Sequence, residues 1–344
     1  MISRRNVITS ISALALTFGM AGGAWAHDHI KVVASFSILG DLVKQVGGEH
    51  VDLTTLVGPD GDAHVYSPSP ADAKAMAQAK IVFVNGLGFE GWMERLVQSS
   101  GSKAEIVAVT DGIKPITFEE DEGHDHGHDH GKDAAKHDHD HDEKHAKHDH
   151  DHDHGKHDHA HEHGHHHHDG PDPHAWQSVG NVKTYVANIR DALIAAAPAE
   201  KVEFDANAAA YLEKLDALDA EVRAAIDAIP AERRTIITSH DAFGYFADAY
   251  GIEVVAPQGV STEAEPTAKD VARLITQIRE EGVKAVFVET ITDPRMIERI
   301  AEEGGAKIGG TLYSDALSPP DGPAGTYIDM MRHNIRTLSA GLSS

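Results

Sequence analysis

Histidine and aspartate alternate over residues 119–169, and this stretch limits the possible folds more than any other feature of the sequence. It contains 20 of the 27 histidines, between His124 and His168. With no large apolar side chain to bury, the segment cannot build a hydrophobic core, and we predict a solvated loop. Imidazole and carboxylate groups suit zinc, copper and nickel, so this composition indicates loose metal binding rather than a plain hydrophilic spacer. Because such a loop lacks rigidity, we expect a selective site elsewhere in the chain.

Residues 1–26 have the pattern of a signal peptide. Arg4 and Arg5 precede an apolar run over 7–21, and small residues follow at the cleavage spacing. The run is shorter than the roughly 20 residues of a membrane span. The general secretory route and the twin-arginine route both remain open. Because the sequence has no cysteine, neither a disulfide nor a lipidated cysteine is expected, and we predict a free periplasmic protein that begins near His27.

The formal net charge is −25, of which residues 119–169 contribute −12 through 17 acids and 5 lysines. An acidic surface repels nucleic acid and attracts divalent cations, so no nucleic-acid partner is expected. About 267 residues remain outside the signal peptide and the histidine-rich segment, which is enough for two α/β lobes.

Short β-branched runs alternate with segments of helical spacing on both sides of the insertion. The predicted strands are 30–37, 51–57, 81–84, 104–109, 235–238, 251–256, 285–289 and 307–312. The predicted helices are 38–46, one starting at Pro70, 92–98, 181–196, 200–229, 267–281 and 295–303. Such alternation implies parallel sheets covered by helices.

The helix over 200–229 carries apolar residues at steps of three and four without an interrupting glycine or proline. At 1.5 Å per residue it would be roughly 45 Å long, which is unusual inside one globular domain. We therefore predict an α/β fold of two parallel-sheet lobes joined by this single long helix. The lobes are expected at 27–197 and 231–344, with the linking helix within 198–230.

Four polar residues follow predicted strands or lie in loops between the lobes, where open α/β sheets bind ligands. They are His64, His174, His240 and Asp315. The other histidines outside the insertion are expected to be exposed; they are His27, His29, His50 and His333. Three imidazoles and one carboxylate suit tetrahedral zinc, whereas a manganese site would contain more oxygen. The sequence thus predicts a metal site between the lobes.

Two enzymatic interpretations compete with this one. Residues 86–91 read Gly-Leu-Gly-Phe-Glu-Gly after a predicted strand, with Asp111 about twenty residues on, a spacing that suits a dinucleotide site in an exported oxidoreductase. Turn glycines are the simpler explanation. A triad of Ser239, His240 and Asp241 is rejected, because adjacent residues do not ordinarily form a Ser-His-Asp relay.

Several motifs together resemble those of one protein family. They are Gly61-Asp62-Ala63-His64-Val65-Tyr66, Asn85-Gly86 with Glu90 and Trp92, Asp172-Pro173-His174-Ala175-Trp176, residues 239–246 (Ser-His-Asp-Ala-Phe-Gly-Tyr-Phe), and Tyr313-Ser314-Asp315. Over the whole mature chain the sequence resembles the zinc-specific cluster A-I substrate-binding proteins of ABC transporters. The resemblance implies two lobes joined by a long helix, with the metal between them.

The resemblance also implies a function and a ligand set. The family's four ligand positions fall on His64, His174, His240 and Asp315, and histidine stands at the third position, where manganese-type members have glutamate. A histidine-rich insertion before the second ligand is typical of the zinc subgroup. We therefore expect a monomeric periplasmic protein without catalytic activity that captures Zn²⁺ and delivers it to an ABC permease. A periplasmic zinc buffer or metallochaperone without a transporter is the alternative.

Overall fold

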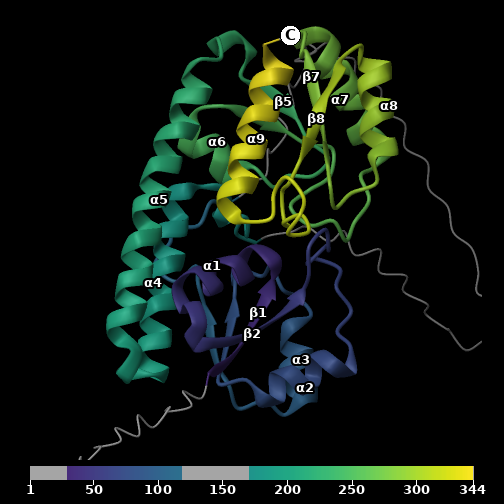
Figure 1. Cartoon of the computed structure of the whole chain (residues 1–344). Helices are drawn as coiled ribbons and strands as arrows, with labels where there is room; N and C mark the ends of the chain where they lie inside the picture. Colours follow the sequence, from purple (N-terminus) through teal and green to yellow (C-terminus); the bar gives the residue numbers. More distant parts are fainter. Residues whose placement is uncertain (1–28, 118–169, 344) are drawn as a thin grey trace, which may run out of the picture.

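Two lobes are stacked one above the other, and the long helix α5 (Lys201–Asp227) runs along one side of both (Figure 1). The computed structural model describes residues 29–117 and 170–343. The predicted signal peptide and the histidine-rich segment lie outside these described residues.

The N-terminal lobe contains one parallel sheet with the strand order β2-β1-β3-β4. The strands are β1 (Ile30–Phe36), β2 (Val51–Val57), β3 (Ile81–Val84) and β4 (Glu105–Ala108), and the helices are α1 (Ser37–Gly47), α2 (Pro70–Gln78) and α3 (Met93–Ser100). The helix α2 begins where predicted, because Ser69 is its N-cap, Pro70 is its first residue, and Ser69 forms a capping box with Asp72.

The C-terminal lobe repeats this plan with the strand order β6-β5-β7-β8, again parallel. Its strands are β5 (Thr235–Ile237), β6 (Glu253–Val255), β7 (Ala285–Glu289) and β8 (Lys307–Leu312), and its helices are α6 (Gly244–Tyr250), α7 (Ala268–Glu281), α8 (Pro294–Gly304) and α9 (Tyr327–Leu342). The strand predicted at 251–256 is shorter than expected. Gly251 ends α6 in a left-handed conformation, with φ of 72°, and therefore cannot begin the strand.

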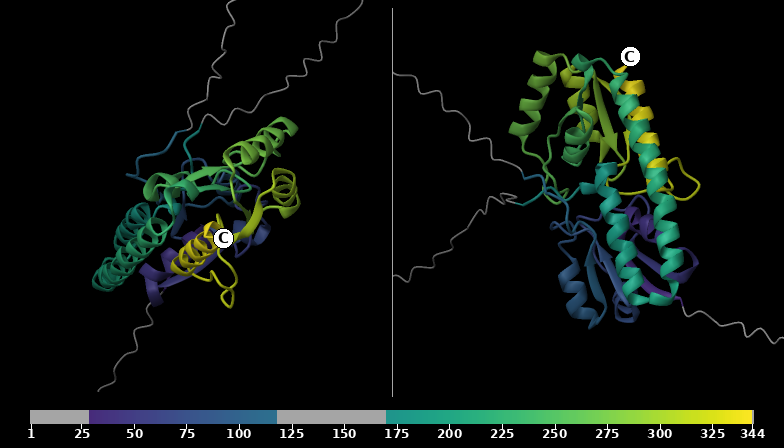
Figure 2. Two further views of the ribbon diagram at one scale, coloured as in Figure 1. Left: turned by 90° about the horizontal axis from the view of Figure 1, so that it is seen from above. Right: turned by 90° about the vertical axis from the view of Figure 1, so that its left-hand side faces the viewer.

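The helices α4 (Val179–Ala196) and α5 (Lys201–Asp227) form an antiparallel hairpin, and α5 extends alongside both lobes (Figure 2). The buried positions of α5 recur at steps of three and four from Phe204 to Ile226, which forms one apolar stripe. This confirms the predicted fold class of two α/β lobes with one long connecting helix. The boundaries of the lobes at 197 and 230 stay predictions.

One continuous apolar core crosses from one lobe to the other. It includes Val33 of the N-terminal sheet and Phe287 and Leu312 of the C-terminal sheet, together with the buried faces of α1, α4, α5 and α9. A smaller core lies between the C-terminal sheet and the helices α7 and α8. Within the described ranges, no helix combines the length and the hydrophobicity needed to cross a membrane.

Candidate metal centre

The four residues singled out in the sequence meet between the two lobes. One ligand atom from each of His64, His174, His240 and Asp315 lies within 4.8 Å of the corresponding atoms of the others. The carboxylate oxygen Oδ2 of Asp315 lies 3.1 Å from His64 Nε2, 3.2 Å from His240 Nε2 and 3.6 Å from His174 Nε2. Three imidazole nitrogens therefore surround one carboxylate oxygen.

His64 belongs to the loop between β2 and α2, and two contacts hold that loop in place. The indole Nε1 of Trp92 donates to the carbonyl oxygen of Ala63 at 2.7 Å, and Oδ1 of Asp62 accepts from the backbone N–H of His64 at 2.8 Å. The side chain of His64 is 5% exposed, whereas the other three ligand candidates have side chains that are 0% exposed. His64 is thus the one member of the site that reaches solvent.

His174 is oriented by Asp172, two residues earlier. Oδ1 of Asp172 lies 2.8 Å from both the backbone N and the ring Nδ1 of His174. With Nδ1–H directed to a carboxylate, Nε2 is left unprotonated in the neutral ring and can bind a metal. Across the lobe boundary, the hydroxyl of Tyr245 donates to the carbonyl oxygen of Asp172 at 2.9 Å and fixes this segment against α6.

His240 follows β5 and is oriented by Glu289, the last residue of β7. Oε2 of Glu289 lies 2.7 Å from His240 Nδ1, and Oε1 accepts the backbone N–H groups of Ser239 and His240 at 2.7 and 2.9 Å. Glu289 is 1% exposed. Two of the three imidazoles therefore have a buried carboxylate on the nitrogen that faces away from Asp315.

Asp315 follows β8, and its neighbour Ser314 is fixed from the N-terminal lobe. The backbone carbonyl of Ser314 accepts from Trp176 Nε1 at 2.8 Å and from Gln177 Nε2 at 2.7 Å. The second carboxylate oxygen of Asp315, Oδ1, is buried and has no hydrogen-bond donor among the described residues. A cation bound beside Asp315 would satisfy this oxygen.

Burial and the surrounding charges shift the pKa values of these groups in different directions. Burial lowers the pKa of His64 below its ordinary value. Burial acts the same way on His174, but Asp315 and Asp172 outweigh it and raise the pKa of His174 to about 9. Glu289 and Asp315 likewise outweigh burial and hold the pKa of His240 well above its ordinary value. At neutral pH the metal-free site therefore carries two imidazolium rings.

Asp315 remains ionised between those rings. Its complete burial alone would raise its pKa, but the positive charges of His240 and His174 hold the pKa well below its usual range. The pKa of Asp241, next to His240, is shifted in the opposite direction to that of Asp315. Burial, together with the charge of Asp172, raises the pKa of Asp241 to about 6.

The glycines at 86–91 form a turn that packs against the metal centre. Gly86, Leu87 and Gly88 have φ values of 88°, 55° and 81°, and α3 begins at Met93, after the last of the glycines, whereas the glycines of a dinucleotide fingerprint open the helix itself. The turn places the Phe89 ring 4.7 Å from the ring of His64. The dinucleotide interpretation is therefore wrong.

A second cluster of possible ligands lies at the start of α5. His50 Nδ1 lies 3.4 Å from Oε2 of Glu200, and His50 Nε2 contacts Oε2 of Glu203. The two carboxylates thus contact opposite nitrogens of one ring, and the carboxylate of Glu203 is largely exposed. His50 and His333 were expected to be exposed, but both are only partly exposed; His333 Nε2 lies 3.0 Å from the carbonyl oxygen of Thr311.

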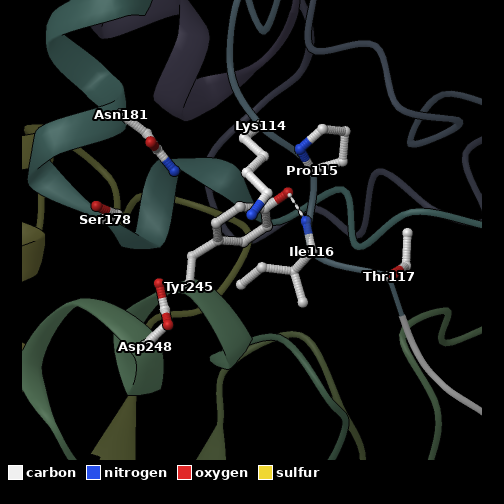
Figure 3. Close-up of a pocket in the computed structure, with 8 residues that line it drawn as sticks. All are labelled: Lys114, Pro115, Ile116, Thr117, Ser178, Asn181, Tyr245 and Asp248. Carbon is white, nitrogen blue, oxygen red and sulfur yellow. Dashed lines mark hydrogen bonds between the residues drawn. The ribbon is translucent and has the colours of Figure 1, made fainter.

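A pocket of about 440 Å³ lies on another part of the lobe boundary (Figure 3). The side chain of Tyr245 crosses it, and its hydroxyl accepts from the backbone N–H of Ile116 at 3.2 Å. Lys114 and Asp248 also line it, but none of the four ligand candidates does. This pocket is therefore part of the boundary between the lobes and not of the metal centre.

Glu289 was not among the site residues predicted from the sequence. The signal was present, because Glu289 is an acidic residue at the carboxyl end of an otherwise apolar strand, β7. A carboxylate there costs free energy unless it is paired, which indicates a buried partner. Asp172 was noted only as part of a motif, and the structure shows its contact with His174.

Two α/β lobes that enclose three imidazoles and one carboxylate define a two-lobed metal-binding protein. The family described as the periplasmic component A of the zinc-uptake complex, ZnuA, matches residues 32–341, and the chain belongs to this family. It is thus a periplasmic metal-binding component of ABC transporters and not an enzyme, as the resemblance implied.

The relatives differ in the metal that their names give. The manganese-binding lipoprotein MntA of Halalkalibacterium halodurans is 32% identical over 339 residues, which cover 98% of this chain and 97% of that protein. The iron-binding protein YfeA of Yersinia pestis is 30% identical over 316 residues, covering 90% and 86%. The solved structure of the periplasmic zinc-binding protein TroA from Treponema pallidum has a TM-score of 0.74 at 29% identity, covering 91% of this chain and 99% of that one.

Proposed function

We propose that this protein captures Zn²⁺ in the periplasm and delivers it to the membrane permease of an ABC-type zinc importer, acting as a monomer. The proposed ligands are His64, His174, His240 and Asp315. The observation that carries the proposal is the convergence of three imidazole Nε2 atoms on one buried carboxylate oxygen. Such a set of three nitrogen ligands and one carboxylate suits tetrahedral Zn²⁺.

The contacts around the proposed ligands support a preformed site. Asp172 and Glu289 each bind the outer nitrogen of one imidazole, an arrangement typical of zinc-binding histidines, whose orientation it fixes. Since these carboxylates are themselves buried and bonded to backbone N–H groups, the rings are held in place before any ion arrives. A site that needs little ordering on binding loses less of its affinity to conformational entropy.

The choice of zinc over manganese follows from the donor atoms. Mn²⁺ prefers carboxylate, carbonyl and water oxygens, and nitrogen-rich sites bind it more weakly than Zn²⁺. We expect chelator-competition titrations to give a Kd for Zn²⁺ at least about 100-fold lower than that for Mn²⁺. The variant His240→Glu, which replaces one nitrogen donor with oxygen, should narrow this ratio, and His333→Gln on α9 is the matched control. Equal affinities for the two metals in the unaltered protein would refute the zinc assignment.

An experiment with the membrane components distinguishes a transport function from a storage function. Zinc-loaded protein added to vesicles that contain its permease and ATPase should stimulate ATP hydrolysis and zinc uptake. The variant His174→Ala, loaded in the same way, should stimulate neither. Tight zinc binding without any stimulation would favour the periplasmic buffer or metallochaperone.

A further inference from the structure

A cleft of about 350 Å³ leads from the surface to His64. It lies between the 86–91 turn of the N-terminal lobe and residues 260–263 of the C-terminal lobe, and Gly170, where the described chain resumes, forms part of its wall. Among the described residues that line it, Glu263 is the only one with a charged side chain besides the titratable His64. An ion with six waters occupies roughly 200 Å³, at about 30 Å³ per water, so a hydrated divalent ion fits this cleft.

The loop that carries Glu263 is attached directly to the metal centre. Gln258 forms a parallel bridge with His240, and its side-chain Nε2 donates to the carbonyl oxygen of Ala264 at 2.8 Å. These two contacts close residues 258–264 into a loop whose base is the ligand candidate itself. Glu263 is exposed, so its carboxylate faces water at the surface end of the cleft.

One side-chain hydrogen bond joins this loop to the His64 loop. The hydroxyl of Thr262 donates to Oδ2 of Asp62 at 2.6 Å, while Oδ1 of the same carboxylate accepts from the backbone N–H of His64 at 2.8 Å. Asp62 therefore couples the position of His64 to that of the 258–264 loop in the other lobe.

We propose that this cleft is the port through which a divalent metal ion enters and leaves, and that Glu263 is a transient ligand at its mouth. The inference rests on the proposed function. A hydrated cation exchanges one water for the Glu263 carboxylate and then passes to Nε2 of His64. Among the four proposed ligands, only His64 has a side chain that reaches solvent. The remaining ligands, which are fully buried, bind the ion after that step.

A residue that acts only on the path must change both rates equally, because it stabilises the barrier region and not the bound state. We expect Glu263→Gln to slow zinc association and dissociation by the same factor, roughly 5- to 10-fold, from the loss of one charge near a divalent ion. The Kd should stay within about twofold. Glu265→Gln, two residues from Glu263 and just beyond the 258–264 loop, lines a different pocket and should change neither rate.

The rates are measured by stopped-flow fluorescence of the full chain with less than one equivalent of Zn²⁺. Trp176 supplies a local signal, because its ring lies 5.2 Å from the ring of His174. Thr262→Val tests the Thr262–Asp62 bond separately: it should speed dissociation and raise Kd, since the His64 loop loses its hydrogen bond to the 258–264 loop.

Two results would overturn the proposal: unchanged rates in Glu263→Gln with intact tight binding, or equal slowing in Glu265→Gln. Failure of the proposed function would look different, because the unaltered protein would then show no tight zinc site at all.

Discussion

Zinc binding should release about two protons per ion at pH 7, although three imidazoles are the proposed nitrogen ligands. Without metal, His174, with a pKa of about 9, and His240, whose pKa is well above its ordinary value, are both protonated at this pH. His64 has a lowered pKa and is already neutral. Zn²⁺ therefore replaces two protons, and the net charge inside the buried site stays the same.

The sign and size of the pH effect follow from this count. Protons bind the metal-free site, so acidification favours the empty state and raises Kd. Each released proton changes Kd about tenfold per pH unit, or about 1.4 kcal/mol. Between pH 7 and pH 6 the Kd should therefore rise about 100-fold. If both histidines had the ordinary pKa of about 6.5, zinc affinity would begin to fall only below that pH. The carboxylates around His174 and His240 raise both pKa values, so the affinity begins to fall at higher pH.

Calorimetry in buffers of different ionisation enthalpy measures the number of protons, with one equivalent of Zn²⁺ so that the tight site is titrated first. The variant Glu289→Gln serves as the matched test, because it removes one of the two charges that keep His240 protonated, and release should fall toward one proton per ion. A tight site that releases no protons at pH 7, or three, would refute this account of the charges in the site.

Three further predictions concern the ligands, their support and the histidine-rich segment. Alanine at any one of the four proposed ligands should weaken the tight site by more than about 100-fold in chelator competition, and unchanged affinity in all four variants would contradict the assignment. Asp172→Asn should raise Kd about 10- to 100-fold while circular dichroism stays unchanged, because His174 loses its orienting carboxylate. Deletion of residues 120–169 should leave one tight site and remove several weaker ones, so the stoichiometry should drop while the lowest Kd barely moves. Filling of the tight site from scarce zinc should then slow. Loss of the tight site in a folded deletion variant would show that histidines of the segment are primary ligands.

The architecture was predictable because its signals are local. Runs of β-branched residues and steps of three and four mark strands and helices from neighbouring residues alone, and their alternation leaves few parallel-sheet arrangements. The ends of elements were less predictable. Gly251 sits beside an apolar run, but it ends a helix rather than beginning a strand, because its left-handed conformation satisfies the last turn of α6.

The candidate ligands were predictable for a topological reason. The carboxyl ends of parallel strands lie at one edge of each sheet, so residues that follow β2, β5 and β8 can meet even though they are far apart in sequence. Glu289 could not be paired with His240 in this way, because the partner of a residue inside a strand depends on which neighbouring strand lies beside it. That order, β5 next to β7, is a property of the folded sheet.

The contacts between the lobes carry a consequence for metal release. The apolar core shared by α1, α5 and α9 continues from one sheet to the other, so a wide separation of the lobes would expose much of it to water. At the mouth of the site, by contrast, the His64 loop is tied to the 258–264 loop by the single bond from Thr262 to Asp62. Displacing the His64 loop would also break the hydrogen bond from the backbone N–H of Asp60 to the carbonyl oxygen of Leu317, but it would uncover little of the core beyond Ala63 and would remove one of four ligands. We therefore expect release to proceed by movement of the His64 loop rather than by rotation of whole lobes.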